Sequence, residues 1–389
     1  MKRHHGFLYV LVLTLFCCKK PYNPPASSSP NSYLVVEGVI NQGGDSTIIK
    51  LSKTVKLDQN NVNNPVLGAV VSVESDQNAS FPLIDRNNTG YYSSPGLNLS
   101  PSNKYRLHIK TAQGSEYLSD FVVVKPTPPI DSIGYTIANG NVNIYVNAHD
   151  ATNSTRYYRW DYQETWQFHA QYYSDWIFDT TAYAIVVRPL NSLIYHCFGN
   201  NNSSDIVLNS TEKLSQDIIY QNPVTQFPIS SEKIETKYSI LVKQYALTED
   251  AFNFYQNLKK NTESLGSIFD AQPSQLTGNI HNVNNPAESV LGYITVTNVQ
   301  SKRIFLNNNI LPPQTETQYP YQCGLDTAKY VTKQGNTVLL DLMELPITNI
   351  PVTAIFGPLG GAPLGFTYSS RECTDCTIRG KVDTPSFWK

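Results

Sequence analysis

The sequence predicts a mainly β chain: an N-terminal sandwich of the immunoglobulin or prealbumin type, followed by a larger fibronectin-like β-sandwich domain with a helical insertion. Tyr (25) and Pro (24) are abundant while Met is nearly absent (2), which favours short strands and turns over helices. Segments in which apolar and polar residues alternate also recur about every ten residues, as half-buried strands and their turns do. The 389 residues, 40% of them hydrophobic, suffice for two or three such cores.

The first 17 residues have the pattern of a bacterial lipoprotein signal peptide. Basic residues at positions 2 and 3 precede an apolar run, 7–16, that is too short to cross a bilayer as a permanent helix. Leu15-Phe16-Cys17-Cys18 fits a lipobox cleaved before Cys18, although a cysteine replaces the small residue usual just ahead of the cut. Acyl chains on Cys18 would make a permanent anchor. The alternative is cleavage to a soluble secreted form.

Residues 18–32 follow as a tether, because this stretch is rich in Pro and Ser and cannot form a core. The tether lacks the acidic pair that often follows the lipidated cysteine of surface-exported lipoproteins, so the sequence leaves open whether the body faces the cell surface or the periplasm. No other apolar run approaches the length of a spanning helix. We therefore expect a bacterial outer-membrane lipoprotein whose body stands in water beside the bilayer.

The charge balance excludes nucleic acid as a partner class. The chain has 29 Lys+Arg against 31 Asp+Glu, a net charge of −2. Loss of the two basic residues of the signal peptide would leave 27 against 31, a net charge of −4. Binding driven by counterion release from phosphates requires a basic excess, which this chain does not have.

Residues 33–127 contain the first predicted sandwich. Leu34–Ile40 and Thr47–Leu51 flank a turn rich in Asn and Gly, which predicts a hairpin. Further strands are expected within 65–74 and at Tyr105–Lys110, where apolar and polar residues alternate. Strands at this spacing, with turn residues between them, are typical of a sandwich of about 95 residues.

The second predicted domain covers residues 128–389. Three prolines within 126–129 cannot donate ladder hydrogen bonds, so the boundary is placed there. The strands expected next are 143–148 and 156–166, the latter as the central strand of the sandwich. In this central strand one face is expected to hold Tyr158, Trp160 and Tyr162, with a change of face at Thr165 or Trp166.

Aromatic residues crowd the segment around the end of this strand and give the candidate ligand or partner surface. The rings that make up this surface are those of Trp166, Tyr172, Tyr173 and Trp176. Rings at such density can stack on sugars or line an apolar pocket, which makes a glycan or a peptide the expected ligand class. The alternative is that they form ordinary sandwich core and an interface with the first domain.

One helix is predicted, at about 249–261. Thr248 is the expected N-cap, two acidic residues follow it in the first turn, and Ala251, Phe254, Tyr255 and Leu258 form one apolar stripe. The preceding segment, Tyr238–Tyr245, alternates as a strand does, so the helix is an insertion on a β scaffold. Later strands are expected at Val290–Val296, Arg303–Leu306 and Thr337–Leu342.

Four cysteines remain once Cys17 is removed and Cys18 is lipidated: Cys197, Cys323, Cys373 and Cys376. An even number in an exported chain predicts two disulfides, with three pairings open. Either Cys373 and Cys376 bond to each other, or they bond separately to the two distant cysteines. A redox dithiol at the C-x-x-C and a four-thiolate zinc site are the functional alternatives. A long-range bridge would hold the C-terminal tail, with Phe387 and Trp388, on the second domain.

The sequence contains no catalytic constellation. Metalloprotease, nucleophile-elbow, phosphate-loop and EF-hand motifs are missing, and the histidines are scattered singly. Asp161 and Glu164 are close in one strand, but their spacing directs them to opposite faces, so they do not form a glycosidase pair. The segment Gly357–Gly365 is expected to be an exposed loop that contacts a partner rather than a phosphate cradle. We expect a non-enzymatic protein without cofactor or metal.

Several motifs along the chain resemble one known family. They are Cys18-Lys19-x-x-Tyr22-x-Pro24, Leu34-Val35-Val36-Glu37-Gly38, Pro128-Pro129-Ile130-Asp131-Ser132, Tyr238–Tyr245, Gly266-Ser267-Ile268-Phe269-Asp270-x-Gln272-Pro273, Gly278-Asn279-Ile280, and Cys373-Thr374-Asp375-Cys376 with Phe387-Trp388. Together they resemble the Bacteroidota lipoprotein family known as domain of unknown function 4249, nearly from end to end. The resemblance implies an outer-membrane lipoprotein encoded beside a TonB-dependent receptor, and it supplies no catalytic residue.

These expectations combine into one hypothesis and one alternative. The protein is expected to be an outer-membrane-anchored, non-catalytic binding component of a TonB-dependent nutrient-uptake system. Its partners would be the membrane, the receptor, and a glycan or peptide ligand. The alternative is a surface structural or adhesive β-sandwich lipoprotein that binds glycans or proteins.

Overall fold

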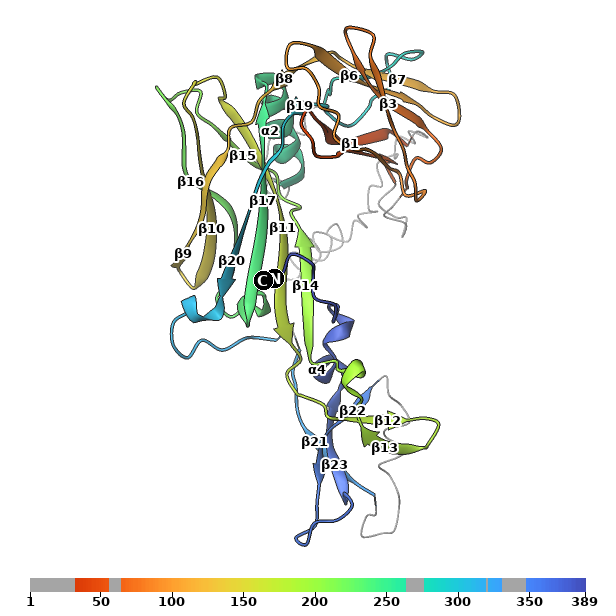
Figure 1. Ribbon diagram of the computed structural model, residues 1–389, viewed down its shortest axis with the longest axis vertical. Coiled ribbons are helices and arrows are strands. Elements are labelled where there is room, and N and C mark those ends of the chain that lie inside the picture. The colour runs from red at the N-terminus through yellow and green to blue at the C-terminus, as the bar shows by residue number, and fades with distance from the viewer. Residues whose placement is uncertain (1–31, 56–63, 264–275, 320, 331–347) are drawn as a thin grey trace, which may run out of the picture.

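The computed structural model describes residues 32–55, 64–263, 276–319, 321–330 and 348–389. These residues are mostly in strands, which form several sheets, with one long helix (Figure 1). The predicted mainly β class is therefore confirmed. Along the long axis of the molecule the chain forms a first sandwich, a second sandwich and a small distal lobe (Figure 1). The predicted signal peptide, Cys18, most of the tether, the segment 266–273 and the strand at 337–342 lie outside the described residues.

The first sandwich forms because its strands alternate as the sequence predicts. Val36 and Ile40 point into the core, as do Ile49 and Leu51 on the next strand, with which they form an antiparallel hairpin. Its strands are β1 (Leu34–Asn41), β2 (Thr47–Lys53), β3 (Val70–Ser75), β4 (Ser80–Leu83), β5 (Tyr91–Ser94), β6 (Lys104–Lys110), β7 (Glu116–Ser119), β8 (Val122–Lys125), β18 (Ile280–Asn282) and β19 (Val296–Thr297). The hairpin and the β6 strand were predicted and are confirmed.

A segment from much later in the chain completes this sandwich. Strand β18 pairs with β7, and β19 lies parallel between β1 and β8. Val290, Ile294 and Val296 belong to the same buried cluster as the β1 core residues. The predicted strand Val290–Val296 is shorter than expected: only the bridge at Leu291 and strand β19 pair with neighbours. Gly292, with a φ of +148°, interrupts the ladder between them.

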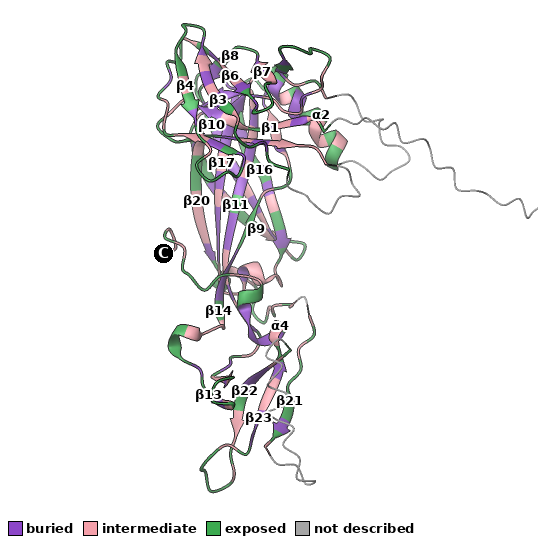
Figure 2. Ribbon diagram, turned by 90° about the vertical axis from the view of Figure 1, so that its right-hand side faces the viewer, coloured by how far each residue is buried: buried purple, intermediate pink, exposed green. Residues whose placement is uncertain are grey.

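The second sandwich packs a three-stranded sheet on a larger one. The first has the order β16-β10-β9 and the second β14-β11-β17-β20, with β15 beside β11. The bounds are β9 (Ile130–Ala138), β10 (Asn141–Asp150), β11 (Tyr157–His169), β14 (His196–Asn202), β15 (Val207–Ser210), β16 (Asp217–Pro228), β17 (Lys237–Leu247) and β20 (Gln300–Asn307). Burial alternates along these strands, so one face forms the core (Figure 2).

Strand β11 is central, as predicted, but it does not change face. Its pairing with β14 and β17 runs without a register shift through Trp166. Even-numbered residues therefore stay on the core side, where Tyr158 and Trp160 are fully buried and are followed on the same face by the buried residues Tyr162 and Glu164. The expected change of face was wrong, because the unshifted register keeps Trp166 on the same side as Tyr158 and Trp160.

Helix α2 (Glu249–Glu263) confirms the predicted insertion. The hydroxyl of Thr248 accepts the N–H of Ala251 at 3.2 Å, which caps the first turn. The apolar stripe of the helix packs on the outer face of the β11/β17 sheet, with Phe254 and Tyr255 buried against Tyr245. The helix thus lies between the two sandwiches (Figure 1).

Hydrogen bonds at the junction fix the two sandwiches to each other. Thr127 lies between β8 and β9, and its hydroxyl is 2.6 Å from the hydroxyl of Thr297 on β19. The same oxygen accepts the N–H of Ala246 on β17 at 2.9 Å. The N–H of Thr127 donates to the side chain of Asn298 at 2.6 Å. Because both threonines are buried, these bonds are shielded from water and hold the junction rigid.

A third, distal lobe was not predicted. Its core is small and aromatic, with Trp176 meeting Phe366 edge-on at a centroid distance of 5.0 Å. It consists of the hairpin β12 (Trp176–Asp179) and β13 (Ala184–Val187) and of the sheet β21 (Asp326–Lys329), β23 (Gly365–Ser370) and β22 (Asn349–Ile355), followed by the short helix α4 (Arg371–Thr374). The lobe extends beyond the end of β11 and β14 (Figure 1).

Two disulfides attach this lobe and the C-terminal tail. Cys376 bonds to Cys197 on β14, and Cys373 bonds to Cys323. Two of the three open pairings join the C-x-x-C cysteines to separate partners, and the structure has the one that joins Cys373 to Cys323 and Cys376 to Cys197. The tail beyond them lies on the second sandwich, where Trp388 packs edge-on against Phe198 at 5.0 Å.

Peptide mapping without reduction should recover the Cys197–Cys376 and Cys323–Cys373 cross-links. Replacing both Cys323 and Cys373 by Ser should lower the free energy of unfolding by about 4 kcal/mol, because the bridge closes a loop of 50 residues. Denaturant titration measures this loss. Recovery of a cross-link between Cys373 and Cys376 would contradict the pairing.

Substitution of Gly292 tests how the late segment completes the first sandwich. A Cβ at this position would lie 2.3 Å from the carbonyl oxygen of Val36. The substituted residue would also have to adopt a φ of +148°, which L side chains rarely do. Gly292→Ala should therefore destabilise the protein by about 2–3 kcal/mol. The matched control is Gly324→Ala, where a Cβ meets nothing within 4 Å. Equal melting temperatures for the two variants would refute the assignment.

Candidate functional site

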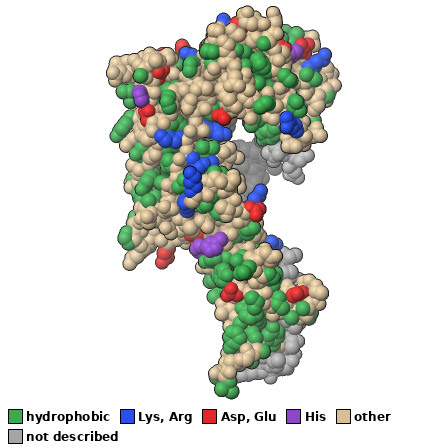
Figure 3. All heavy atoms as spheres, viewed as in Figure 1, with side chains coloured by type: hydrophobic (Ala, Val, Ile, Leu, Met, Phe, Trp, Pro, Cys, Tyr) green, Lys and Arg blue, Asp and Glu red, His purple; other side chains and the backbone are tan. Residues whose placement is uncertain are grey.

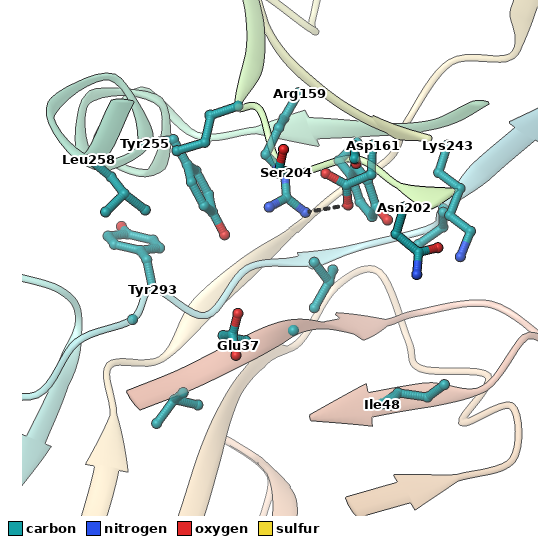
Figure 4. Close-up of a pocket in the computed structure, with 18 of the residues that line it drawn as sticks. Glu37, Ile48, Arg159, Asp161, Asn202, Ser204, Lys243, Tyr255, Leu258 and Tyr293 are labelled. Atoms are coloured by element: carbon teal, nitrogen blue, oxygen red, sulfur yellow. Dashed lines mark hydrogen bonds and ion pairs between the residues drawn. The ribbon is translucent and has the colours of Figure 1, made fainter. Parts of the chain in front are cut away.

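A cleft of about 960 Å³ lies between the two sandwiches and is the candidate binding site (Figure 4). One wall is the β1–β2 hairpin of the first sandwich, which contributes Glu37 and Ile48. The opposite wall is the outer face of β11 and β17, and helix α2 with Tyr293 closes one end. Clefts between domains are common ligand sites, because two rigid bodies can enclose a ligand that neither holds alone.

The alternation of β11 places charged residues on the cleft wall. While its even-numbered residues face the core, Arg159, Asp161 and Gln163 face outward into the cleft. Strand β17 pairs antiparallel with β11, so that Lys243 lies directly opposite Asp161 and Tyr245 opposite Arg159. The polar face of a central strand is the sequence signal that could have indicated this wall.

Arg159 is held between two aromatic rings. Its guanidinium carbon is 4.5 Å from the ring centroid of Tyr245 and 4.6 Å from that of Tyr255, as in cation–π contacts. Its Nη2 donates to Asp161 at 3.3 Å, and its buried Nε has no partner within the described part of the chain. Burial alone would lower the pKa of Arg159, but the neighbouring tyrosines and Asp161 raise it above its ordinary value. The group is a fixed cation.

The other charged residues of the cleft differ in how they are paired. The Lys243 side chain has no hydrogen-bond or ion-pair partner among the described residues, and it extends into the cleft (Figure 4). Glu37 on the facing wall is already paired with Lys50 at 2.7 Å, and this hydrogen bond raises the pKa of Lys50. Arg159 and Lys243 therefore remain as the cations available to a ligand.

The end of the cleft beneath helix α2 is apolar. Leu258 and Tyr293 lie there side by side (Figure 4), and both pack with Val39 and Leu276 on the cluster around Phe254. Burial raises the pKa of the Tyr293 hydroxyl, so the group stays neutral. The cleft thus offers a cationic region on the sheet and an apolar region at the helix, which together suit an amphipathic ligand.

The four predicted aromatic residues do not form one surface. Trp166 packs between the second core and the Cys197–Cys376 cluster. Tyr172 is held by its N–H to the carbonyl of Cys373, and Trp176 belongs to the distal core. Tyr173 is the exposed member, with 43% of its surface accessible. Trp166 and Trp176 therefore fit the alternative interpretation, in which the rings belong to the core, better than the interpretation as a ligand surface.

Asp161 and Glu164 lie on opposite faces of β11, as predicted. Asp161 faces the cleft, whereas Glu164 is 1% exposed between the two sheets. Its carboxylate accepts hydrogen bonds from the Tyr238 hydroxyl at 2.8 Å and from Lys233 and Asn201 at 2.7 and 3.2 Å. A satisfied, ion-paired carboxylate in the core has a structural role.

The described residues contain no cluster of three or more His, Cys, Asp or Glu that could hold a metal ion. The four cysteines form disulfides, which leaves neither a dithiol at the C-x-x-C nor thiolates for zinc. His108, in a strand as predicted, bridges Glu74 and Glu116 at 2.7 and 2.8 Å. Within the described ranges, no helix has the length and apolarity needed to cross a bilayer.

Comparison with protein-family models assigns the chain to a known family. The sequence model of a family described as "Domain of unknown function (DUF4249)" matches residues 19–303. These residues include the first sandwich, nearly all of the second, helix α2 and every residue that lines the cleft, but none of the β21-β23-β22 sheet of the distal lobe. No curated protein matches the chain.

The buried carboxylate allows a stability test of the β11 register. Tyr238→Phe removes a hydrogen bond to the charged Glu164 and should lower the free energy of unfolding by about 1.5–3 kcal/mol, as measured by urea titration. The matched control is Tyr220→Phe, since Tyr220 is 76% exposed and should tolerate the change. A loss below about 0.5 kcal/mol in Tyr238→Phe would show that Glu164 does not depend on this partner.

Proposed function

The chain belongs to the DUF4249 family, and we propose that it is a lipid-anchored, non-catalytic binding protein of a TonB-dependent uptake system. In this proposal the cleft between the sandwiches holds a ligand near the membrane, and a TonB-dependent receptor receives it. The cleft carries the proposal, because it combines a large volume with two available cations and an apolar end.

The membrane part of the proposal rests on the sequence around Cys18. A basic start, an apolar run and Leu15-Phe16-Cys17-Cys18 form the lipobox pattern. The 15 residues from 18 to 32 span at most about 50 Å when fully extended, at about 3.4 Å per residue. A body linked in this way would stay within that distance of the bilayer, close enough to meet a receptor in the same membrane. The side of the membrane stays open in the proposal.

The receptor part of the proposal is supported by the distal lobe. Its exposed apolar residues include Val187, Leu190 and Leu359, which are 65%, 85% and 101% exposed. The described segment 348–370 carries no charged residue, and its β22–β23 turn contains the predicted exposed loop Gly357–Gly365. Figure 3 shows hydrophobic side chains gathered over this lobe. Such patches on a protein in water are typical of protein contacts.

The second candidate function, a structural or adhesive surface module, is favoured by the same exposed lobe. An adhesin would use the lobe to contact glycans or host proteins and would leave the cleft empty. A transport accessory would need both the cleft and a receptor. The identity of what is retained in native membranes therefore separates the two functions.

Affinity purification from native membranes in mild detergent should recover a TonB-dependent receptor with the protein. Leu359→Asp combined with Leu190→Asp should reduce this recovery at least about 10-fold, because charges in an apolar contact are left without partners. Leu214→Asp is the matched control, since Leu214 is 53% exposed on the second sandwich. Recovery of glycans or foreign proteins without a receptor would favour the adhesive function.

Cys18→Ala should release the protein from the membrane fraction, since the anchor would be lost. Incorporation of labelled palmitate into the unaltered chain, and its absence in the variant, provides the direct measurement. A variant that sediments with membranes as completely as the unaltered protein would contradict lipid anchoring.

A further inference from the structure

Resting on the proposed function, the geometry points to the class of ligand: we infer that the cleft binds an organic monocarboxylate with an apolar body. The carboxylate would lie between Arg159 and Lys243, and the apolar body would extend toward Leu258 and Tyr293 beneath helix α2. The inference stands on the placement and pairing of these groups.

Arg159 has the donors that a carboxylate requires. Its guanidinium carries five N–H groups in a planar fork, which matches the two oxygens of a carboxylate. Its Nη2 donates to Asp161 at 3.3 Å, and its Nε has no acceptor within the described part of the chain. The rings of Tyr245 and Tyr255 fix the plane of the fork, and Figure 4 shows it directed into the cleft. A ligand oxygen would give the remaining donors an acceptor.

Lys243 provides the second positive charge. It lies opposite Asp161 across the β11–β17 ladder, so two cations flank one carboxylate on this wall. The excess of one positive charge on the wall suits one negative charge on the ligand. Asp45 and Asp205 also line the cleft, and Glu37 faces it while paired with Lys50. Because these anions repel a ligand in proportion to its negative charge, they disfavour phosphates and other multiply charged ligands more than a monocarboxylate.

The aromatic rings of the cleft argue against a neutral sugar. Sugars bind to free ring faces, but Arg159 already covers a face of Tyr245 and of Tyr255. Tyr293 packs against Phe254 at a centroid distance of 5.4 Å. What remains beneath helix α2 is aliphatic surface from Leu258, Leu276 and Val39. This surface favours an acyl chain or an apolar side chain over a hydroxylated ring.

The test measures binding to the detergent-solubilised full-length protein. The probes are octanoate, phenylpropionate and the N-acetylated peptide Ala-Leu-Phe, each compared with its neutral amide by isothermal titration calorimetry. At least one carboxylate should bind, and its amide should bind about 10- to 100-fold more weakly, as expected for loss of charge-assisted hydrogen bonds.

Variants expected to weaken binding and a variant expected to strengthen it together separate loss of carboxylate recognition from damage to the fold. Arg159→Met and Lys243→Met should each weaken carboxylate binding about 10- to 100-fold while leaving binding of the amide nearly unchanged. Asp161→Asn should strengthen carboxylate binding several-fold, because it removes the negative charge that competes for both cations. Lys110→Met, at an exposed position on β6 away from the cleft, is the matched control and should not alter binding.

Three outcomes would overturn the inference: equal affinity for acids and amides, an unchanged or weakened affinity in Asp161→Asn, or no binding of any probe. Its failure is distinguishable from that of the proposed function. If the receptor co-purifies but acids are not preferred, only the ligand class is wrong. If carboxylates bind but no receptor is recovered, the site stands and the uptake role falls.

Discussion

The register of β11 is the constraint on which the rest of the structure depends. In a strand, successive side chains point to opposite faces, so one run of residues builds two environments. The even-numbered residues, from Tyr158 through Glu164, form the centre of the second core. The odd-numbered residues, including Arg159 and Asp161, form the wall of the cleft. A shift of one residue would bury Arg159 and expose Trp160, so the core fixes the cleft wall.

The opposite wall is fixed by a different set of interactions. Segment 276–299 completes the first sandwich through β18 and β19 and continues directly into β20 of the second sandwich. The buried hydrogen bonds around Thr127 and Thr297 join the same two bodies. Because the chain crosses the junction repeatedly, the hairpin with Glu37 stands at a defined distance from Arg159. A binding cleft that is formed before the ligand arrives loses less conformational entropy on binding.

Local patterns in the sequence predict the elements well and their assembly poorly. The β1–β2 hairpin, β6, β11, β17 and helix α2 follow from periodicity and capping, which depend on neighbouring residues. The pairing of Val296 with β1, more than 250 residues earlier, cannot be predicted from neighbouring residues. Gly292 also interrupts the regular strand pattern just before Val296. The cysteine count gave two disulfides but not their pairing, which depends on the distal lobe. The cleft was missed because Arg159, Lys243 and Glu37 meet only after assembly, whereas the aromatic cluster chosen as a surface proved to be partly core.

The central claim is that the cleft holds a small ligand while the protein is attached to its native membrane. In the direct measurement, the photo-cross-linking residue p-benzoylphenylalanine replaces Leu258, intact cells are irradiated, and the mass of the purified protein is determined. The account predicts a discrete added mass of a small carboxylate at this position, and none when the same residue is placed at Leu214 on the outer surface of the second sandwich. An unmodified protein at Leu258, or the same adducts at both positions, would contradict it.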